Sequence, residues 1–427
     1  MNKNRHQPAG VSERLQYLVH EFNDNTVRFV LDYLGIVDPD ILCSATYSLI
    51  NRIDILHGSF VPGGLRSHWH INENIPCSAY FQYIPTSSDP SITAYSLSLL
   101  PIHPEDQAQL HCTLVQNEVK SSIVVRISHL CVDGSDGKYL LSKLVEAYNL
   151  LLRQQIDLLQ VKNGNRAAEQ AYEKLNWKET LSLMNNPLSS TNTLYPCPDS
   201  EDSFLRFVRQ VIPASTMSAA RQKAKKIGAT ANDLLLAAFY QAYAHTEGTD
   251  PHVPMSITSM MDLRRHCKNG ESEGLCNLSG ALPTTLPQGV PGNFSDTLAE
   301  VCRQTTVMKQ NPYAGLEGIP LLHSVTRTLP IWLLLLLTGK VYGKMSLGLT
   351  NLGNLSCADL ALGSLIPTGG MFGGPVKKKP GMQISAISFD GNCVLTVIGP
   401  FTSADASLLQ STLRQIAAEI ENYAFPE

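Results

Sequence analysis

Short β-branched runs and segments with helical spacing of apolar residues follow one another along most of the chain. The clearest strand is 122–128, a short β-branched run of Ile and Val residues that contains one arginine, Arg126. In 138–148 the apolar positions recur three and four residues apart, with Leu140, Leu141 and Leu144 on one face, which predicts an amphipathic helix. These segments predict a buried strand joined by a short loop to a helix.

Similar patterns predict further elements on both sides of this pair. We expect helices after Asp38-Pro39, from near Ser215 to Gly228, after Thr230 with Asp233 at the third helical position, and over 404–423. We expect strands at 204–212, 253–260, 383–389 and 393–398. Strands and helices mix without strict alternation, so the predicted fold class is α/β or α+β.

Length and turn composition suggest two similarly sized parts. A chain of 427 residues can bury two cores, so its length fits one large domain or two medium ones. The segment 185–202 is rich in Asn, Ser, Pro and Asp, which favours a linker. We therefore predict an N-terminal lobe at 1–190 and a C-terminal lobe at 200–427. The glycine-rich segment 369–375 predicts a mobile loop.

Composition excludes some partners. The formal net charge is −4 with no basic stripe, which argues against nucleic acid. The polar N-terminus predicts no secretory signal, and the apolar run 331–337 is too short for a transmembrane segment. That run fits buried core best; the wall of a channel for an apolar substrate and a membrane-surface contact are the alternatives. Ten cysteines without a Cys-x-x-Cys pair predict reduced, mostly buried thiols in a cytoplasmic protein.

One short motif carries the strongest chemical signal. His129 follows the predicted strand, Asp133 and Gly134 come four and five residues later, and the predicted helix begins just beyond them. An imidazole held on a loop between two rigid elements is typical of a catalytic site. The simpler interpretation is a core or loop histidine beside an Asp-Gly turn. Cys131 lies inside the motif between apolar neighbours and predicts packing rather than a nucleophile.

The string His129 to Gly134 resembles the H-x-x-x-D-G signature of the chloramphenicol-acetyltransferase-like acyltransferases. That superfamily includes condensation domains and alcohol acetyltransferases. Other segments resemble it in the expected order: 37–42, 53–60, 228–239, 261–265 and 350–355. Condensation domains usually carry a second histidine where this chain has Ser128. The Asp-Phe-Gly-Trp-Gly motif of the plant-type branch is absent from the sequence.

The resemblance implies two similar lobes with a central tunnel and His129 near its midpoint. It implies an acyltransferase in which His129 is the general base. An acyl group would move from a thioester, acyl-CoA or an acyl carrier protein, to a hydroxyl or amine of a small-molecule acceptor. A thioester donor supplies a good leaving group, the thiolate, so neither a covalent enzyme intermediate nor a permanently bound cofactor is required. We expect a monomer, with a carrier protein as a conceivable partner.

The resemblance also assigns roles to other residues of the motif. Asp133 is expected to be structural and to pair with an arginine, either Arg264 or Arg265. Gly134 permits a close backbone path behind the base. If the ion pair is buried, loss of one partner leaves an uncompensated charge.

Two further segments offer groups for the substrates. Thr350 and Asn351 are candidate donors to the oxyanion, or lie in a turn or strand crossing. The basic run that includes Lys377 and Lys378 is either a solvated charge run or a site for coenzyme A phosphates or a carrier protein. The glycine-rich segment 369–375 would form a lid over the tunnel.

The other clusters of chemically active residues are weaker. His68, His70 and Glu73 have no identifiable third partner for a metal, so we predict no metal site there. His266, Cys267 and Cys276 lack a recognised zinc spacing. Two other functions stay open: a cyclase or isomerase on the same scaffold, and a non-catalytic module that binds a carrier protein or an apolar ligand.

Overall fold

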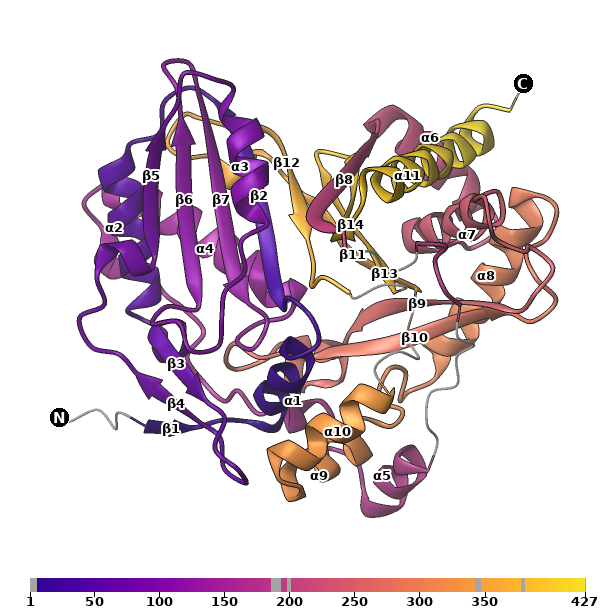
Figure 1. Cartoon of the computed structure of the whole chain (residues 1–427), viewed down its shortest axis with the longest axis horizontal. Helices are drawn as coiled ribbons and strands as arrows, with labels where there is room; N and C mark the ends of the chain where they lie inside the picture. Colours follow the sequence, from indigo (N-terminus) through magenta and orange to yellow (C-terminus); the bar gives the residue numbers. More distant parts are fainter. Residues whose placement is uncertain (1–5, 186–192, 198–200, 342–346, 378–380, 427) are drawn as a thin grey trace.

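The computed structural model describes residues 6–185, 193–197, 201–341, 347–377 and 381–426. Two lobes lie side by side, each built on its own β-sheet (Figure 1). The two-lobed mixed α/β architecture expected from the sequence is confirmed. Most of the predicted linker, 185–202, lies outside the described residues.

The N-terminal lobe contains a five-stranded mixed sheet. Its strand order is β12-β2-β7-β6-β5, with only β5 and β6 parallel. The strands are β2 (Thr26–Leu34), β5 (Phe81–Pro85), β6 (Leu110–Gln116), β7 (Lys120–Ser128) and β12 (Pro367–Gly373). Helices α2 (Pro39–Ile50) and α4 (Gly134–Leu152) pack together on one face, and α3 (Pro90–Ser98) covers the other. Because both faces are covered, β7 is buried over almost its whole length.

The C-terminal lobe contains a six-stranded sheet of order β10-β9-β11-β13-β14-β8. Its strands are β8 (Phe204–Ile212), β9 (Met255–Asp262), β10 (Ser279–Leu286), β11 (Leu347–Leu355), β13 (Met382–Phe389) and β14 (Asn392–Phe401). Four helices cover its outer face: α6 (Ala214–Lys225), α7 (Ala231–Ala244), α8 (Phe294–Gln310) and α11 (Ser403–Ala424). Ile387, Phe389 and Val394 point the other way, into the core of the N-terminal lobe. The two sheets are therefore joined by apolar packing.

Strand β12 connects the lobes more directly. It comes from the C-terminal part of the chain but pairs antiparallel with β2 at the edge of the N-terminal sheet. The lobe predicted at 200–427 thus donates a strand to the lobe predicted at 1–190. The prediction of a mobile loop at 369–375 is wrong, since Met371 and Phe372 are buried strand residues. Glycines weaken a strand signal in sequence, but here they allow close backbone approach.

Gly370 provides a test of this connection. A Cβ atom on Gly370 would overlap the carbonyl oxygen of Val30 across the β12–β2 ladder. We expect Gly370→Ala to lower the free energy of unfolding by about 1–3 kcal/mol. Gly369→Ala is the matched control, because a Cβ there meets no atom within 4 Å. Equal midpoints of denaturant unfolding for the two variants would contradict the observed pairing.

A third group of elements lies below the two lobes in Figure 1. It includes a three-stranded sheet of β1 (His6–Pro8), β3 (Gly58–Val61) and β4 (His68–Ile71), with helices α1 (Val11–His20), α5 (Trp177–Met184), α9 (Ile319–Thr328) and α10 (Ile331–Val341). Helix α10 contains the apolar run 331–337. The prediction of buried core is wrong for most of that run, because Trp332 and Leu336 are 63% and 62% exposed while Leu334 is buried.

The cysteines follow the sequence-based prediction more closely. All ten are free thiols, and eight are buried. Cys77 is exposed and Cys43 is partly exposed, with their sulfur atoms 3.2 Å apart.

Within the described ranges no helix combines the length and apolar character needed to cross a bilayer.

Candidate active site

His129 lies where the two lobes meet. The chain leaves β7 at Ser128, places His129 in the following loop and enters α4 at Gly134. The backbone N–H of His129 donates to the carbonyl of Asn25 at 2.9 Å, which fixes the loop. The imidazole Nδ1 lies 2.7 Å from the side-chain nitrogen of Asn277, which precedes β10 of the C-terminal lobe. Each lobe thus supplies one side of this contact.

Asn277 controls the orientation of the imidazole. Its Oδ1 accepts from the backbone N–H of Ser279 at 3.2 Å, which turns Nδ2 toward the ring. In this orientation Nδ1 accepts a hydrogen bond, so a neutral ring carries its proton on Nε2. With the amide turned over, the Asn277 oxygen would accept from Nδ1–H and leave Nε2 ready to take a proton. The amide can therefore support the imidazole in either tautomer.

Burial sets the proton affinity of His129. The side chain is only partly exposed, and the loss of solvation lowers its pKa below the ordinary value of 6.5. The charge of Asp133 and the carbonyl groups of His129 and Val132 act in the opposite direction, because they favour the protonated ring. Burial is the larger effect. The ring is therefore neutral at pH 7 and able to accept a proton.

This pKa shift predicts a pH profile. A general base with a lowered pKa stays unprotonated at acidic pH, so kcat/KM should stay level as the pH falls to about 6.5 and decline only below that. The measurement is kcat/KM from about pH 4.5 to 8.5. Burial, and then the charge of Asp133, raise the pKa of Asp136 to about 6, so Asp136→Asn is the control. An acidic decline of kcat/KM with its midpoint above pH 7, in both the wild type and Asp136→Asn, would contradict the assignment of His129 as the base.

Asp133 lies in a buried ion cluster behind the imidazole. One of its carboxylate oxygens caps α4 by accepting from the N–H of Asp136 at 2.9 Å. The other accepts from Arg264 Nη1 at 2.7 Å and from the N–H of Leu278 at 2.8 Å. Arg264 also contacts Asp136 at 2.8 Å and Asp262 at 3.0 Å. The cluster joins the N-terminus of α4 to the C-terminal lobe.

Arg264, and not Arg265, is the arginine on Asp133. Burial opposes the charge of Arg264, but Asp133 and Asp136 together raise its pKa. Its remaining donors are also used, by Ser272 Oγ at 3.1 Å and the carbonyl of Cys276 at 3.0 Å. Arg265 is exposed. Both carboxylate oxygens of Asp133 are thus engaged in structural hydrogen bonds. His129 is the side chain of the motif that remains available to act on a substrate.

Gly134 and β11 meet at close range. A Cβ on Gly134 would lie 2.5 Å from Leu352 Cδ2, so the glycine lets α4 begin against that strand. Lys138 donates to the carbonyl of Leu352 at 3.0 Å. Thr350 and Asn351 belong to the same strand, where the register with β13 shifts after Asn351. In the described part of the chain neither forms a hydrogen bond with His129, so their role as oxyanion donors stays a prediction.

The structure describes one of the two lysines predicted to bind coenzyme A phosphates, Lys377. The ammonium group of Lys377 lies against Gly348 of β11, and burial lowers its pKa to about 8. It therefore points inward rather than forming part of a solvated charge run. Lys378 lies outside the described residues.

The structure supports no metal centre among the residues it describes. His68 and His70 do share a face of β4, and His6 of β1 adds a third ring with centroids 5.0 and 5.1 Å from theirs. His266 instead contacts the carbonyl of Ala314 at 2.9 Å. These histidines lie apart from the motif.

Cys131 is a poor candidate nucleophile. It is 1% exposed, and burial raises the pKa of its thiol well above the ordinary value. The residues that sequence reasoning missed are Asn277 and Asp136. Asp136 lies two residues beyond the motif, and its carboxylate could have been suspected. Asn277 lies 148 positions from His129, and no pattern in one sequence marks it.

No family model matches the sequence. No curated protein matches it. Solved structures, however, match over nearly the whole chain. The first condensation domain of the calcium-dependent antibiotic synthetase, in complex with a substrate analogue, has a TM-score of 0.70 at 14% identity, with 98% of each chain covered.

Two other structures are similar to the same extent. Polyketide synthase associated protein 5 from Mycobacterium tuberculosis gives a TM-score of 0.65 at 14% identity, covering 97% of this chain and 100% of that one. The epimerization domain from the third module of tyrocidine synthetase B gives 0.66 at 15% identity, covering 98% and 97%. With its two sheets and full-length match, the chain has the fold of these condensation and epimerization domains.

Proposed function

We propose that this protein is an acyltransferase that moves an acyl group from a thioester to a hydroxyl or amine, with His129 as general base. The observation that carries the proposal is the neutral imidazole held between the lobes by Asn277, with Asp133 occupied by Arg264. An imidazole in that state can remove a proton from a bound nucleophile, and this direct transfer does not require an acyl group to be attached to the protein.

The reaction follows from ordinary acyl-transfer chemistry. The reactive state requires the Asn277 amide turned over from its orientation in the structure, so that its oxygen accepts from Nδ1–H and Nε2 is free. Nε2 of His129 then takes the proton of the acceptor as its oxygen or nitrogen attacks the thioester carbonyl. The tetrahedral intermediate collapses, the carbon–sulfur bond breaks, and the thiolate recovers the proton from His129. The products are an ester or amide and a free thiol. Thr350 and Asn351 are the proposed donors to the oxyanion.

The donor thioester is either acyl-CoA or an acyl group on a carrier protein. Thioester transfer needs no resident cofactor, because the leaving thiol makes the acyl carbon reactive. The similar solved structures include domains of synthetases and a protein associated with a polyketide synthase. A carrier-bound donor is therefore part of the proposal. The inward position of Lys377 gives less support to a surface site for coenzyme A phosphates.

The test is thiol release from acyl-CoA donors and from an acylated carrier protein, with mixed alcohol and amine acceptors. We expect release that depends on both the acceptor and His129. His129-dependent conversion of a single substrate without any thioester would instead identify a cyclase or isomerase. Binding that survives His129→Ala, with no turnover of any donor, would identify a non-catalytic module.

A further inference from the structure

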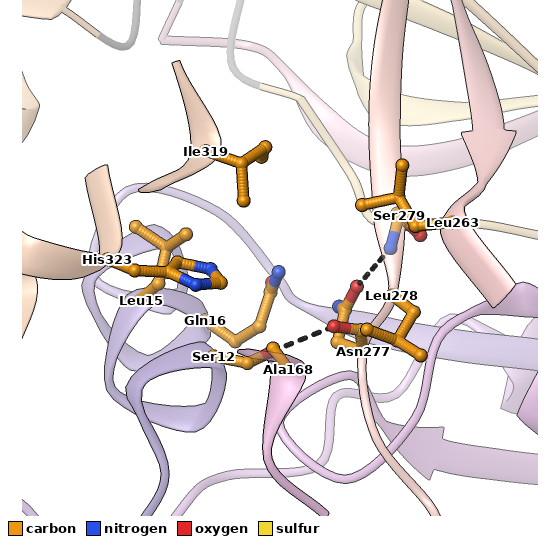
Figure 2. Close-up of a pocket in the computed structure, with 10 residues that line it drawn as sticks. All are labelled: Ser12, Leu15, Gln16, Ala168, Leu263, Asn277, Leu278, Ser279, Ile319 and His323. Carbon is orange, nitrogen blue, oxygen red and sulfur yellow. Dashed lines mark hydrogen bonds between the residues drawn. The ribbon is translucent and has the colours of Figure 1, made fainter. Parts of the chain in front are cut away.

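A second chemical feature lies beside the imidazole, in a small pocket between α1, β10 and α9 (Figure 2). Its lining is part polar and part apolar, and comes from both lobes and from α9. The residues are Ser12, Leu15, Gln16, Ala168, Leu263, Asn277, Leu278, Ser279, Ile319 and His323. None of them is an acid, a lysine or an arginine.

The pocket shares Asn277 with the catalytic imidazole. The backbone carbonyl of Asn277 accepts from Ser12 Oγ at 3.1 Å, while its side chain contacts His129 at 2.7 Å. A second connection runs through Asn25, whose side chain donates to Gln16 Oε1 at 2.9 Å and whose carbonyl holds the backbone of His129. The pocket is therefore connected to the base through Asn277 and Asn25.

Two side chains in the pocket offer hydrogen bonds that the protein does not use. His323 is 6% exposed, and its Nδ1 is taken by the hydroxyl of Tyr172 at 3.0 Å. Its Nε2 has no hydrogen-bond partner among the described residues. Gln16 uses its oxygen for Asn25, and its NH₂ group likewise has no partner in the described ranges. Figure 2 shows the His323 ring and the Gln16 amide facing Asn277 and Ser279 across the pocket.

The electrostatics of the pocket are neutral. Burial lowers the pKa of His323 to about 4, so its ring carries no charge at pH 7. Leu15, Leu263 and Ile319 add apolar surface beside the polar groups. A carboxylate or ammonium group placed here would lose water without gaining an opposite charge, which is strongly unfavourable. A neutral hydroxyl could accept from Gln16 and share a hydrogen bond with His323.

We propose that this pocket binds a second, uncharged hydroxyl group of the acyl acceptor, with His323 and Gln16 as its hydrogen-bond partners. The proposal rests on the acyltransferase function and specifies its acceptor as an uncharged polyol or hydroxy ester rather than an amino acid or a hydroxy acid. Sites that hydrogen-bond a substrate hydroxyl discriminate strongly against molecules that leave those partners unpaired.

A binding measurement tests this without any thioester. The probe is 1,4-butanediol, compared with succinate and 1,4-diaminobutane, which have the same chain length but carry a charged group at each end in place of the hydroxyls. Nitrogen-15 spectra of histidine-labelled protein report on His323, whose signal is identified by its loss in His323→Asn. We expect saturable shifts of that signal with the diol and binding weaker by about tenfold or more for both charged probes. No saturable shift with the diol, or equal binding of all three, would overturn the proposal.

Substitutions give an independent test that does not depend on the stability of one variant. Gln16→Glu retains an oxygen for Asn25 and adds a negative charge, so the preference should move from the diol to 1,4-diaminobutane. Tyr172→Phe removes the partner of His323 Nδ1 and should weaken diol binding. Leu322→Ala is the matched control, since this neighbour of His323 is 40% exposed and does not line the pocket. An unchanged preference in Gln16→Glu would contradict the assignment.

The failure of this proposal can be told from failure of the acyltransferase function. If His129-dependent acyl transfer occurs but KM for diol and charged acceptors is the same and unaffected at Gln16 and His323, only the pocket assignment falls. If the diol binds at His323 and no thioester is ever consumed, the pocket assignment stands as a hydroxyl site and the acyltransferase function falls.

Discussion

His129→Ala should slow acyl transfer by about 10²–10⁴-fold, the usual contribution of a positioned general base. The side chain is partly exposed and hydrogen-bonds Asn277, and it belongs to no apolar core cluster, so its removal takes away the base without emptying a core. The midpoint of thermal unfolding should stay close to that of the wild type. Steady-state rates and a melting curve on the same preparation measure both effects.

His111→Ala supplies the matched control. His111 is also an imidazole on the N-terminal sheet, and burial lowers its pKa to about 4. It contacts Thr113 and has no hydrogen bond to the motif within the described residues. We expect His111→Ala to retain acyl transfer. A loss of rate in both variants, or in neither, would show that acyl transfer does not depend specifically on His129 as the base.

Asp133→Ala should act mainly on stability, lowering the free energy of unfolding by about 3–5 kcal/mol. The substitution leaves the buried Arg264 with less compensation, uncaps α4 and leaves the N–H of Leu278 without its acceptor. Both members of the pair are nearly inaccessible, at 7% and 3% exposed. Urea unfolding monitored by circular dichroism measures the change.

Asp262→Ala separates burial from charge in the same cluster. Asp262 also contacts Arg264, at 3.0 Å, but its side chain is 43% exposed. Solvent screens such a pair, and we expect a loss of about 1 kcal/mol or less. Equal destabilisation by Asp133→Ala and Asp262→Ala would show that the buried carboxylate of Asp133 contributes no more to stability than the exposed carboxylate of Asp262.

Local patterns were sufficient where neighbouring residues determine the structure. The predicted strand 204–212 is β8, and the run 122–128 lies within β7. Thr230 caps α7 with Asp233 in a capping box, because both partners lie within one turn. The pairing of Asp133 with one of two arginines came from the family resemblance, and only the fold distinguishes Arg264 from Arg265.

Long-range contacts explain what the sequence did not reveal. Strand β12 is defined by pairing with β2, more than 300 positions earlier, and its glycines suggested a loop. Asn277 becomes part of the site only when the C-terminal lobe approaches β7. The apolar run 331–337 suggested core, but its helix lies on the outside, where one side has no protein to cover it. Periodicity identifies an element, and tertiary packing decides what it faces.

The central claim is direct transfer of an acyl group to an acceptor with His129 as base. Its most direct test is a rapid-quench reaction with an isotope-labelled thioester and an acceptor, in which free thiol, acylated product and the mass of the protein are followed together. We predict that thiol and product appear in equal amounts, at a rate lost in His129→Ala, with no acyl group on the protein at any time. A kinetically competent acyl-protein, or label released as free acid independently of His129, would contradict it.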